Sequence, residues 1–206
     1  MVPRPAVEKT SAFLNIPYDK HFENLYLAYI AGLTAFGLVP RATLEIPGGS
    51  RRLDRIFELI QTCGFSFHDL SRVQRDRSTP KTPRFNMPFE LGLAVAWSKS
   101  GGRNDQVWFV LEAVDRRILK SLSDLNGTDV YVHGSQVKGV LRALSNALVR
   151  NVNQPTLQQM MSLYRKLRRA VPSILNNRGA SSTFEARVFK DLVQLAASLS
   201  KDVSEP

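Results

Sequence analysis

The sequence predicts an α/β protein, in which a parallel β-sheet carries helices on both faces and two further helices follow at the C-terminal end. Two observations favour this fold. Five short apolar segments with strand character alternate with segments whose apolar residues recur at helical spacing. Beyond residue 150 the alternation stops and only helical patterns remain. The five expected strands are 12–16, 38–44, 65–68, 106–111 and 130–132.

Residues that start and stop helices mark the segments between these strands. Asp19 or a neighbouring residue is expected to open the first helix and Gly37 to end it, while Pro40 favours an edge position or a late start for the strand at 38–44. Ser50 is placed to cap the next helix, whose expected apolar face is Leu53, Ile56, Phe57 and Ile60. The later helices are expected at 86–97, 115–122, 135–149, 155–171 and 182–199. We therefore expect an α/β domain over residues 1–150 and a helical extension over residues 151–206.

Composition limits the class of protein. The 206 residues are 43% hydrophobic and 22% charged, which is typical of a globular chain with one sizeable core. Cys63 is the only cysteine, so an internal disulfide is excluded and a reducing compartment is expected. The first residues lack the apolar core of a signal peptide, and the longest charge-free apolar run, 25–40, falls short of the ~20 residues that span a bilayer. We expect a cytoplasmic protein with no membrane association.

Segment 86–97 contains the most conspicuous polar residue. Pro88 and the helix formers after it indicate a helix start, with Asn86 placed to cap it. Glu90 falls in the expected first turn, among apolar neighbours that desolvate it. An acid there also suits the helix dipole, so an ordinary structural role stays open.

The segments before Glu90 carry a resemblance. A buried strand at 65–68 leads into Asp69-Leu70-Ser71, then a basic loop, then the helix with Glu90-Leu91-Gly92-Leu93-Ala94. This order resembles the nucleoside 2-deoxyribosyltransferase-like and Toll/interleukin-receptor (TIR)-like superfamily, over roughly residues 12–133. The resemblance implies a five-stranded flavodoxin-like sheet and a catalytic role for Glu90.

Several polar residues follow the expected strands and should gather near Glu90, because ligands of open parallel sheets bind beyond the strands' carboxyl ends. Tyr18 is expected to stack on a base or bond to Glu90, or to be a tyrosine at the edge of the core. Asp69 is expected to bind a sugar hydroxyl, serve as a second acid, or cap the next turn. Asn86 is expected to bind a ribose hydroxyl or only to cap. The expected substrate-binding residues are Asn15, Tyr18, Asp69, Ser71, Asn86 and Arg84.

Other chemistries find less support. His21, His68 and His133 are dispersed without metal-ligand spacing, so no metal site and no resident cofactor are expected. Phosphate-binding glycine loops and the nucleophile elbow of hydrolases are missing. One departure from the family is informative: its nucleoside transferases carry an acid shortly before the nucleophilic glutamate, whereas residues 82–86 hold Arg84 and no acid. A phosphorylated substrate fits better, and the cationic nicotinamide of NAD would leave without that acid.

The net charge of the chain is +10, and the charged residues are unevenly distributed along it. No acid lies between Asp129 and Glu185, while eight Lys and Arg residues do. Such a block favours an anionic partner, including nucleic acid through residues 135–178, or is a solvated helix face. The helical stripe of Leu157, Met160, Met161, Tyr164 and Leu167 is expected to pack on its own domain or on a second copy.

These observations together predict cleavage of an N-glycosidic bond in NAD or a related nucleotide. The resemblance implies a bacterial stress or phage-defence effector that works as a homo-oligomer or with a partner protein. The alternatives are nucleoside or nucleotide deoxyribosyl transfer, a nucleotide sensor without turnover, and a basic adaptor.

Overall fold

The computed structural model describes residues 6–45, 51–72, 85–100, 106–120 and 122–201, and its centre is a five-stranded sheet. All four strand pairs are parallel, in the order β2-β1-β3-β4-β5, which is the flavodoxin-like order. The predicted fold class is confirmed, and so is the edge position of the strand with Pro40. The strands are β1 (Glu8–Asn15), β2 (Val39–Arg41), β3 (Cys63–Asp69), β4 (Val107–Glu112) and β5 (Val130–Val132).

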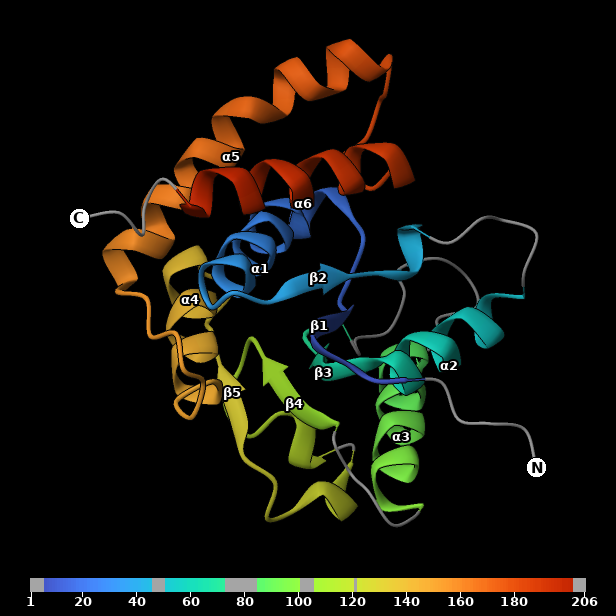
Figure 1. The fold of residues 1–206 in the computed structure, drawn as a ribbon. Coiled ribbons are helices and arrows are strands. Elements are labelled where there is room, and N and C mark those ends of the chain that lie inside the picture. The colour runs from blue at the N-terminus through green and yellow to red at the C-terminus, as the bar shows by residue number, and fades with distance from the viewer. Residues whose placement is uncertain (1–5, 46–50, 73–84, 101–105, 121, 202–206) are drawn as a thin grey trace.

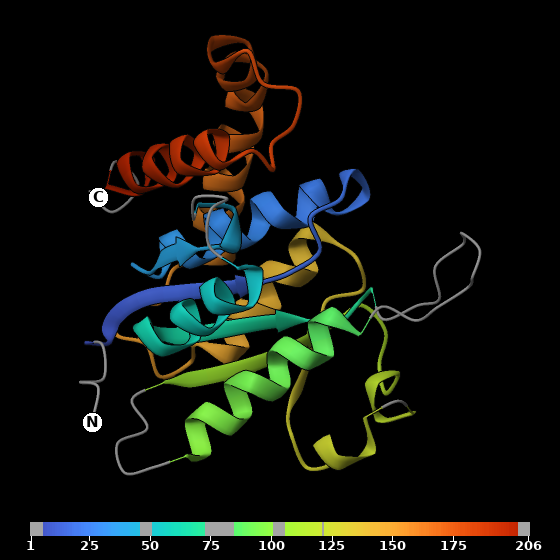
Figure 2. The same cartoon turned by 90° about the vertical axis from the view of Figure 1, so that its right-hand side faces the viewer.

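Helices cover both faces of this sheet (Figures 1 and 2). They are α1 (Glu23–Ala35), α2 (Arg52–Thr62), α3 (Asn86–Lys99), α4 (Val137–Ala147), α5 (Leu157–Arg178) and α6 (Ala186–Lys201). Successive strand residues point to opposite faces. Leu14 therefore joins the main core under α1 and α4, while Phe13 packs under α2 and α3.

The two C-terminal helices form a further layer outside α1 (Figure 1). The inward side of α5 buries Met160, Leu163, Tyr164 and Leu167, so the chain covers most of the expected apolar stripe itself. These residues belong to the same continuous core as α1. The helix continues through Pro172, beyond the expected end at 171, and stops where Gly179 adopts a left-handed φ of 59°.

Two expectations about local structure are corrected. The helix expected at 115–122 is wrong: short 3₁₀ turns occupy Ile118–Lys120 and Ser123–Leu125, after a left-handed Arg116 with φ 55° that interrupts a helix. Leu53 and Phe57 are 48% and 36% exposed, because α2 turns Leu59 inward beside Ile56 and Ile60.

Two further helix starts are expected, at Asp19 and at Ser50. Asp19 does open a helical segment, since its Oδ1 accepts a hydrogen bond from the Phe22 N–H at 3.1 Å and caps the 3₁₀ turn Lys20–Phe22 before α1. Ser50 and its expected cap lie outside the described residues. In the described ranges, no helix is both long and apolar enough to cross a membrane.

Gly139 near the start of α4 allows the helix to approach the turn after β5. A Cβ there would lie 1.9 Å from the carbonyl oxygen of His133, a backbone atom that cannot swing aside. We expect Gly139→Ala to lower the free energy of unfolding by more than about 2 kcal/mol, through backbone displacement. Urea unfolding monitored by circular dichroism measures the change.

Gly92 on α3 is the matched control, because a Cβ there meets nothing within 4 Å. Gly92→Ala should raise the free energy of unfolding by about 0.5–1 kcal/mol, as alanine restricts the unfolded chain and favours the helix. Equal effects of the two substitutions would show that the close approach of α4 to His133 has no energetic weight.

Candidate functional site

Polar side chains meet where the parallel strands end. Asn15, Asp69 and Glu112 are the last residues of β1, β3 and β4, and His133 follows β5 directly. The register pairs Asn15 with His68 and Asp69 with Leu111, so these ends are level across the sheet. Two separate polar centres form at this edge, one around Glu90 and one around Asp69.

Glu90 belongs to the inward side of α3. The helix begins at Asn86, so Glu90 is its fifth residue and lies in the second turn, not in the first as expected. Asn86 is exposed and is the first helical residue; the preceding residue, Phe85, makes no side-chain cap. Glu90 shares its side of the helix with the buried Leu91 and Ala94, and its side chain is only 4% exposed. A stabilising contact with the first-turn dipole therefore does not explain Glu90.

The carboxyl group of Glu90 is desolvated, and among the described residues only the Arg52 guanidinium lies at ion-pair distance from it. Burial raises its pKa to about 7, and the nearby Arg52 guanidinium opposes that rise. Arg52 Nη2 lies 4.0 Å from Glu90 Oε1, which is an ion-pair distance and beyond a hydrogen bond. Among the hydrogen bonds between described residues, none involves the Glu90 side chain.

Asn15 links the sheet to the start of α3. Its Nδ2 donates to the Met87 carbonyl oxygen at 3.3 Å and lies 2.9 Å from His68 Nδ1. Burial lowers the pKa of His68 to about 3, so the ring is neutral at pH 7 and its Nδ1 can accept from the amide. The other nitrogen, Nε2, then donates to Ser66 Oγ at 3.0 Å. Asn15 Oδ1 is buried and has no hydrogen-bond partner among the described residues.

Tyr18 is half-buried after β1, and its hydroxyl donates to the Leu14 carbonyl oxygen at 2.9 Å. Its pKa is raised well above the ordinary value, first by burial and then by the negative charge of Glu90. The Phe184 ring, from the turn before α6, lies 6.0 Å from the Tyr18 ring. The C-terminal extension therefore packs against a side chain of the candidate site.

Asp69 lies in the second centre and is fully buried. Its Oδ2 accepts from the Tyr29 hydroxyl at 2.7 Å and lies 3.1 Å from His133 Nε2. Its Oδ1 accepts from the Ser71 N–H at 2.9 Å. Protein donors thus occupy both oxygens, and in this arrangement Asp69 acts within the protein rather than on a substrate.

Ser71, His133 and Asp69 have the composition of a nucleophilic triad but not its geometry. The Ser135 N–H donates to His133 Nδ1 at 3.1 Å, so a neutral ring carries its proton on Nε2. That same nitrogen faces both Asp69 and Ser71 Oγ, the latter at 3.0 Å. In a working triad the carboxylate and the serine use opposite ring nitrogens. His133 therefore cannot accept the Ser71 proton here.

Arginines complete the edge next to this centre. Arg117 donates to the carboxylate of the fully buried Glu112 and, at 2.7 Å, to the Ser71 carbonyl oxygen. Arg72 pairs with Asp19 at 3.0 Å. Arg84 lies outside the described residues. In the described part of the chain, no three His, Cys, Asp or Glu side chains converge as a metal site.

Sequence reasoning missed several members of the two centres. Glu112 and His133 each stand at the end of an expected strand, which is the same signal that pointed to Asp69. Arg52 and Tyr29 gave no such signal, because their positions depend on how α2 and α1 pack.

Comparison of the chain with protein-family models, with curated protein sequences and with solved structures gives no match in any of the three. The class of the protein therefore rests on its strand order, and the candidate site rests on the geometry described above.

The pKa of Glu90 makes stability depend on pH. The pKa is about 7 in the folded protein and near 4.5 in the unfolded chain, so the folded state binds the proton more tightly. The free energy of unfolding should fall as the pH rises from about 4.5 through about 7, by at most about 3 kcal/mol. Glu90→Gln removes this loss, so the variant should gain stability relative to the parent across that window. Urea unfolding between about pH 5 and pH 8 measures it; a constant difference between the two proteins would contradict the desolvated carboxylate.

The Tyr29 hydroxyl should stabilise the protein through the Asp69 carboxylate. Tyr29→Phe leaves a buried charge with one donor fewer, and we expect a loss of about 1.5–3 kcal/mol. Tyr164→Phe is the control, because its hydroxyl donates to the neutral Asn24 Oδ1 at 3.2 Å, and should cost about 1 kcal/mol or less. Calorimetric or urea unfolding compares the two; similar losses would mean that Asp69 does not depend on Tyr29.

Proposed function

We propose that this protein cleaves an N-glycosidic bond in NAD or a related nucleotide, with Glu90 as the catalytic carboxylate. One observation carries the proposal. Glu90 is buried at the carboxyl edge of a flavodoxin-like sheet, its pKa is raised to about 7, and no described residue satisfies its oxygens with a hydrogen bond. Buried ionisable groups with a shifted pKa are typical of functional sites.

The chemistry matches what such a carboxylate does well. As the bond between the sugar C1′ and the base nitrogen breaks, its electron pair leaves with the base and positive charge develops on the sugar. A desolvated carboxylate lowers its own energy when that charge appears, so it stabilises the transition state more than the ground state. It either forms a transient covalent bond to C1′ or stabilises the cation. In both cases water then adds at C1′ and loses a proton, and the carboxylate is released.

The leaving group follows from what the loop lacks. No acid precedes Glu90 within residues 82–86 to protonate a departing neutral base. The nicotinamide of NAD is cationic and becomes neutral when it takes the electron pair, so it needs no proton. The phosphates of a nucleotide would suit Arg52, whose side chain is 55% exposed beside Glu90. Arg84, also expected to bind substrate, lies outside the described residues.

The surroundings of Glu90 support the remaining parts of the proposal. Asn15 Oδ1, which has no hydrogen-bond partner among the described residues, would accept from a sugar hydroxyl, and the Tyr18 ring would contact a base. Phe85, just before α3, and Phe89 on α3 are 67% and 54% exposed near Glu90, which favours a second copy or a partner protein against this end of the helix. A role as a bacterial stress or phage-defence effector rests on the family resemblance alone.

Incubation with NAD, a nucleoside monophosphate and the matching nucleoside, followed by chromatography for released base, tests the proposal. We expect release from NAD, weaker or no release from the bare nucleoside, and a loss of about 1,000-fold or more in Glu90→Gln. Glu58→Gln on the exposed side of α2 is the matched control and should keep the parent rate.

The alternatives give different results in the same assay. Exchange of a labelled free base into the nucleotide would indicate deoxyribosyl or ribosyl transfer. Tight nucleotide binding with no released base, in calorimetry, would indicate a sensor without turnover. A folded Glu90→Gln variant that turns over at the parent rate would remove Glu90 from the mechanism.

A further inference from the structure

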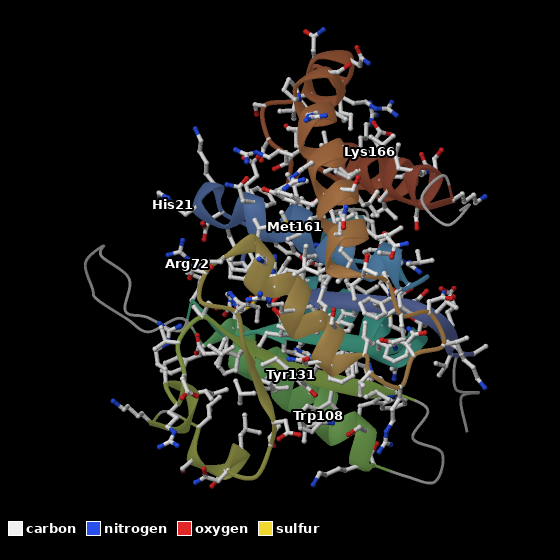
Figure 3. All side chains as sticks on the ribbon, turned by 90° about the vertical axis from the view of Figure 1, so that its left-hand side faces the viewer. His21, Arg72, Trp108, Tyr131, Met161 and Lys166 are labelled. Carbon is white, nitrogen blue, oxygen red and sulfur yellow. The ribbon has the colours of Figure 1, made fainter. Side chains whose placement is uncertain are left out.

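The outward side of α5 carries a turn of four cations, which we call the basic turn: Arg165, Lys166, Arg168 and Arg169. All four side chains are exposed. With 3.6 residues per turn, Arg165, Lys166 and Arg169 point away from the buried stripe that contains Leu163 and Leu167. Figure 3 views this side of the molecule, with Lys166 on the upper part of α5. The fold thus holds these charges on a rigid helix of 22 residues.

No nearby acid neutralises the basic turn. From Val130 to Phe184 the chain has no Asp or Glu, so α4 and α5 themselves contribute none. The acids on the neighbouring elements are engaged elsewhere. Asp191 of α6 pairs with Arg178, and Glu23 of α1 accepts from Thr183 Oγ1 at 2.7 Å. Glu185 accepts from backbone N–H groups before α6, including that of Ser181 at 2.8 Å.

The neighbouring helix adds charge of the same sign. Lys138 and Arg142 are exposed one helical turn apart on α4, which packs against α5. Both helices face the viewer in Figure 3. Within the described residues, none of these six cations of α4 and α5 forms an ion pair with the protein.

We propose that the basic turn of α5, with Lys138 and Arg142 of α4, docks the phosphate backbone of a nucleic acid. Protein interfaces need an apolar or aromatic centre within a polar rim. In the described part of α5, no large apolar side chain is more than a third exposed. Nucleic-acid interfaces are instead polar and strongly positive. A guanidinium group can donate two parallel hydrogen bonds to phosphate oxygens.

The contacts available are to phosphate, so the binding is independent of base sequence. Neutralising phosphates releases counterions, and the affinity then falls steeply with salt. Each cation that contacts a phosphate contributes about one unit to the slope of log affinity against log salt. This inference does not rest on the activity of Glu90, because binding alone is measured.

Fluorescence anisotropy of a labelled duplex DNA and of a single-stranded RNA, each of about 20 nucleotides in length, tests the proposal between about 50 and 200 mM KCl. The test variant changes all four cations of the basic turn to Gln. We expect it to lose at least about 30-fold in affinity near 100 mM KCl and to flatten the salt slope by about 3. Circular dichroism checks that the variant is folded, since all four side chains are on the surface.

A matched control removes the same charge elsewhere, by changing Lys9, Lys20, Lys99 and Lys120, all exposed, to Gln. It should stay within about threefold of the parent affinity. Equal losses in both variants would assign the binding to net charge and overturn the proposal. Absence of binding by the parent near 50 mM KCl would also overturn it. Tighter binding to poly-glutamate than to either nucleic acid would reassign this side of the molecule to an acidic protein.

Discussion

The structure depends on the compensation of one buried charge, that of Asp69. A carboxylate with no exposure to solvent costs several kcal/mol unless donors surround it. Its donors come from α1, from the turn after β3 and from the turn after β5, through Tyr29, Ser71 and His133. These elements can satisfy Asp69 only when strand ends β3 and β5 are level and α1 lies across the sheet. The same carboxylate therefore fixes the edge at which the candidate site stands.

Glu90, at the same edge of the sheet, has far fewer partners than Asp69. It is nearly as buried as Asp69, yet Arg52 at 4.0 Å is its only ion-pair partner among the described residues. The cost of this burial appears as a pKa of about 7. The fold thus compensates Asp69 with three donors, whereas among the described residues Glu90 has only Arg52 at ion-pair distance. The catalytic role proposed for Glu90 rests on this contrast between the two carboxylates.

The C-terminal helices pack against the domain on one side and are exposed to solvent on the other. On the inner side, α5 and α6 extend the core of α1, and Phe184 between them packs on Tyr18 and Tyr26. The Tyr26 hydroxyl donates to the Thr183 carbonyl oxygen at 3.2 Å, which anchors that turn. On the outer side, α5 carries the four exposed cations of the basic turn and no acid. The turn that follows α5 packs against Tyr18, a side chain of the candidate site.

Local sequence patterns were sufficient to predict much of the fold and to single out Glu90. Alternating strand and helix signals predicted the five strands and the parallel sheet, Pro40 predicted the edge strand, and apolar neighbours singled out Glu90. These features depend on periodicity and on the conformational limits of single residues, which a sequence displays directly. The resemblance to a known family pointed to the same glutamate.

The tertiary structure decided how deep each polar group lies and what it touches. Asp69 meets Tyr29 and His133, which lie 40 and 64 positions away in the chain, and Glu90 meets Arg52, from a helix that precedes it by two elements. The start of α3 at Asn86 moved Glu90 from an expected first turn into a buried second turn. Contacts of this kind follow from strand order and helix packing, which bring distant residues together, and no local pattern records that proximity.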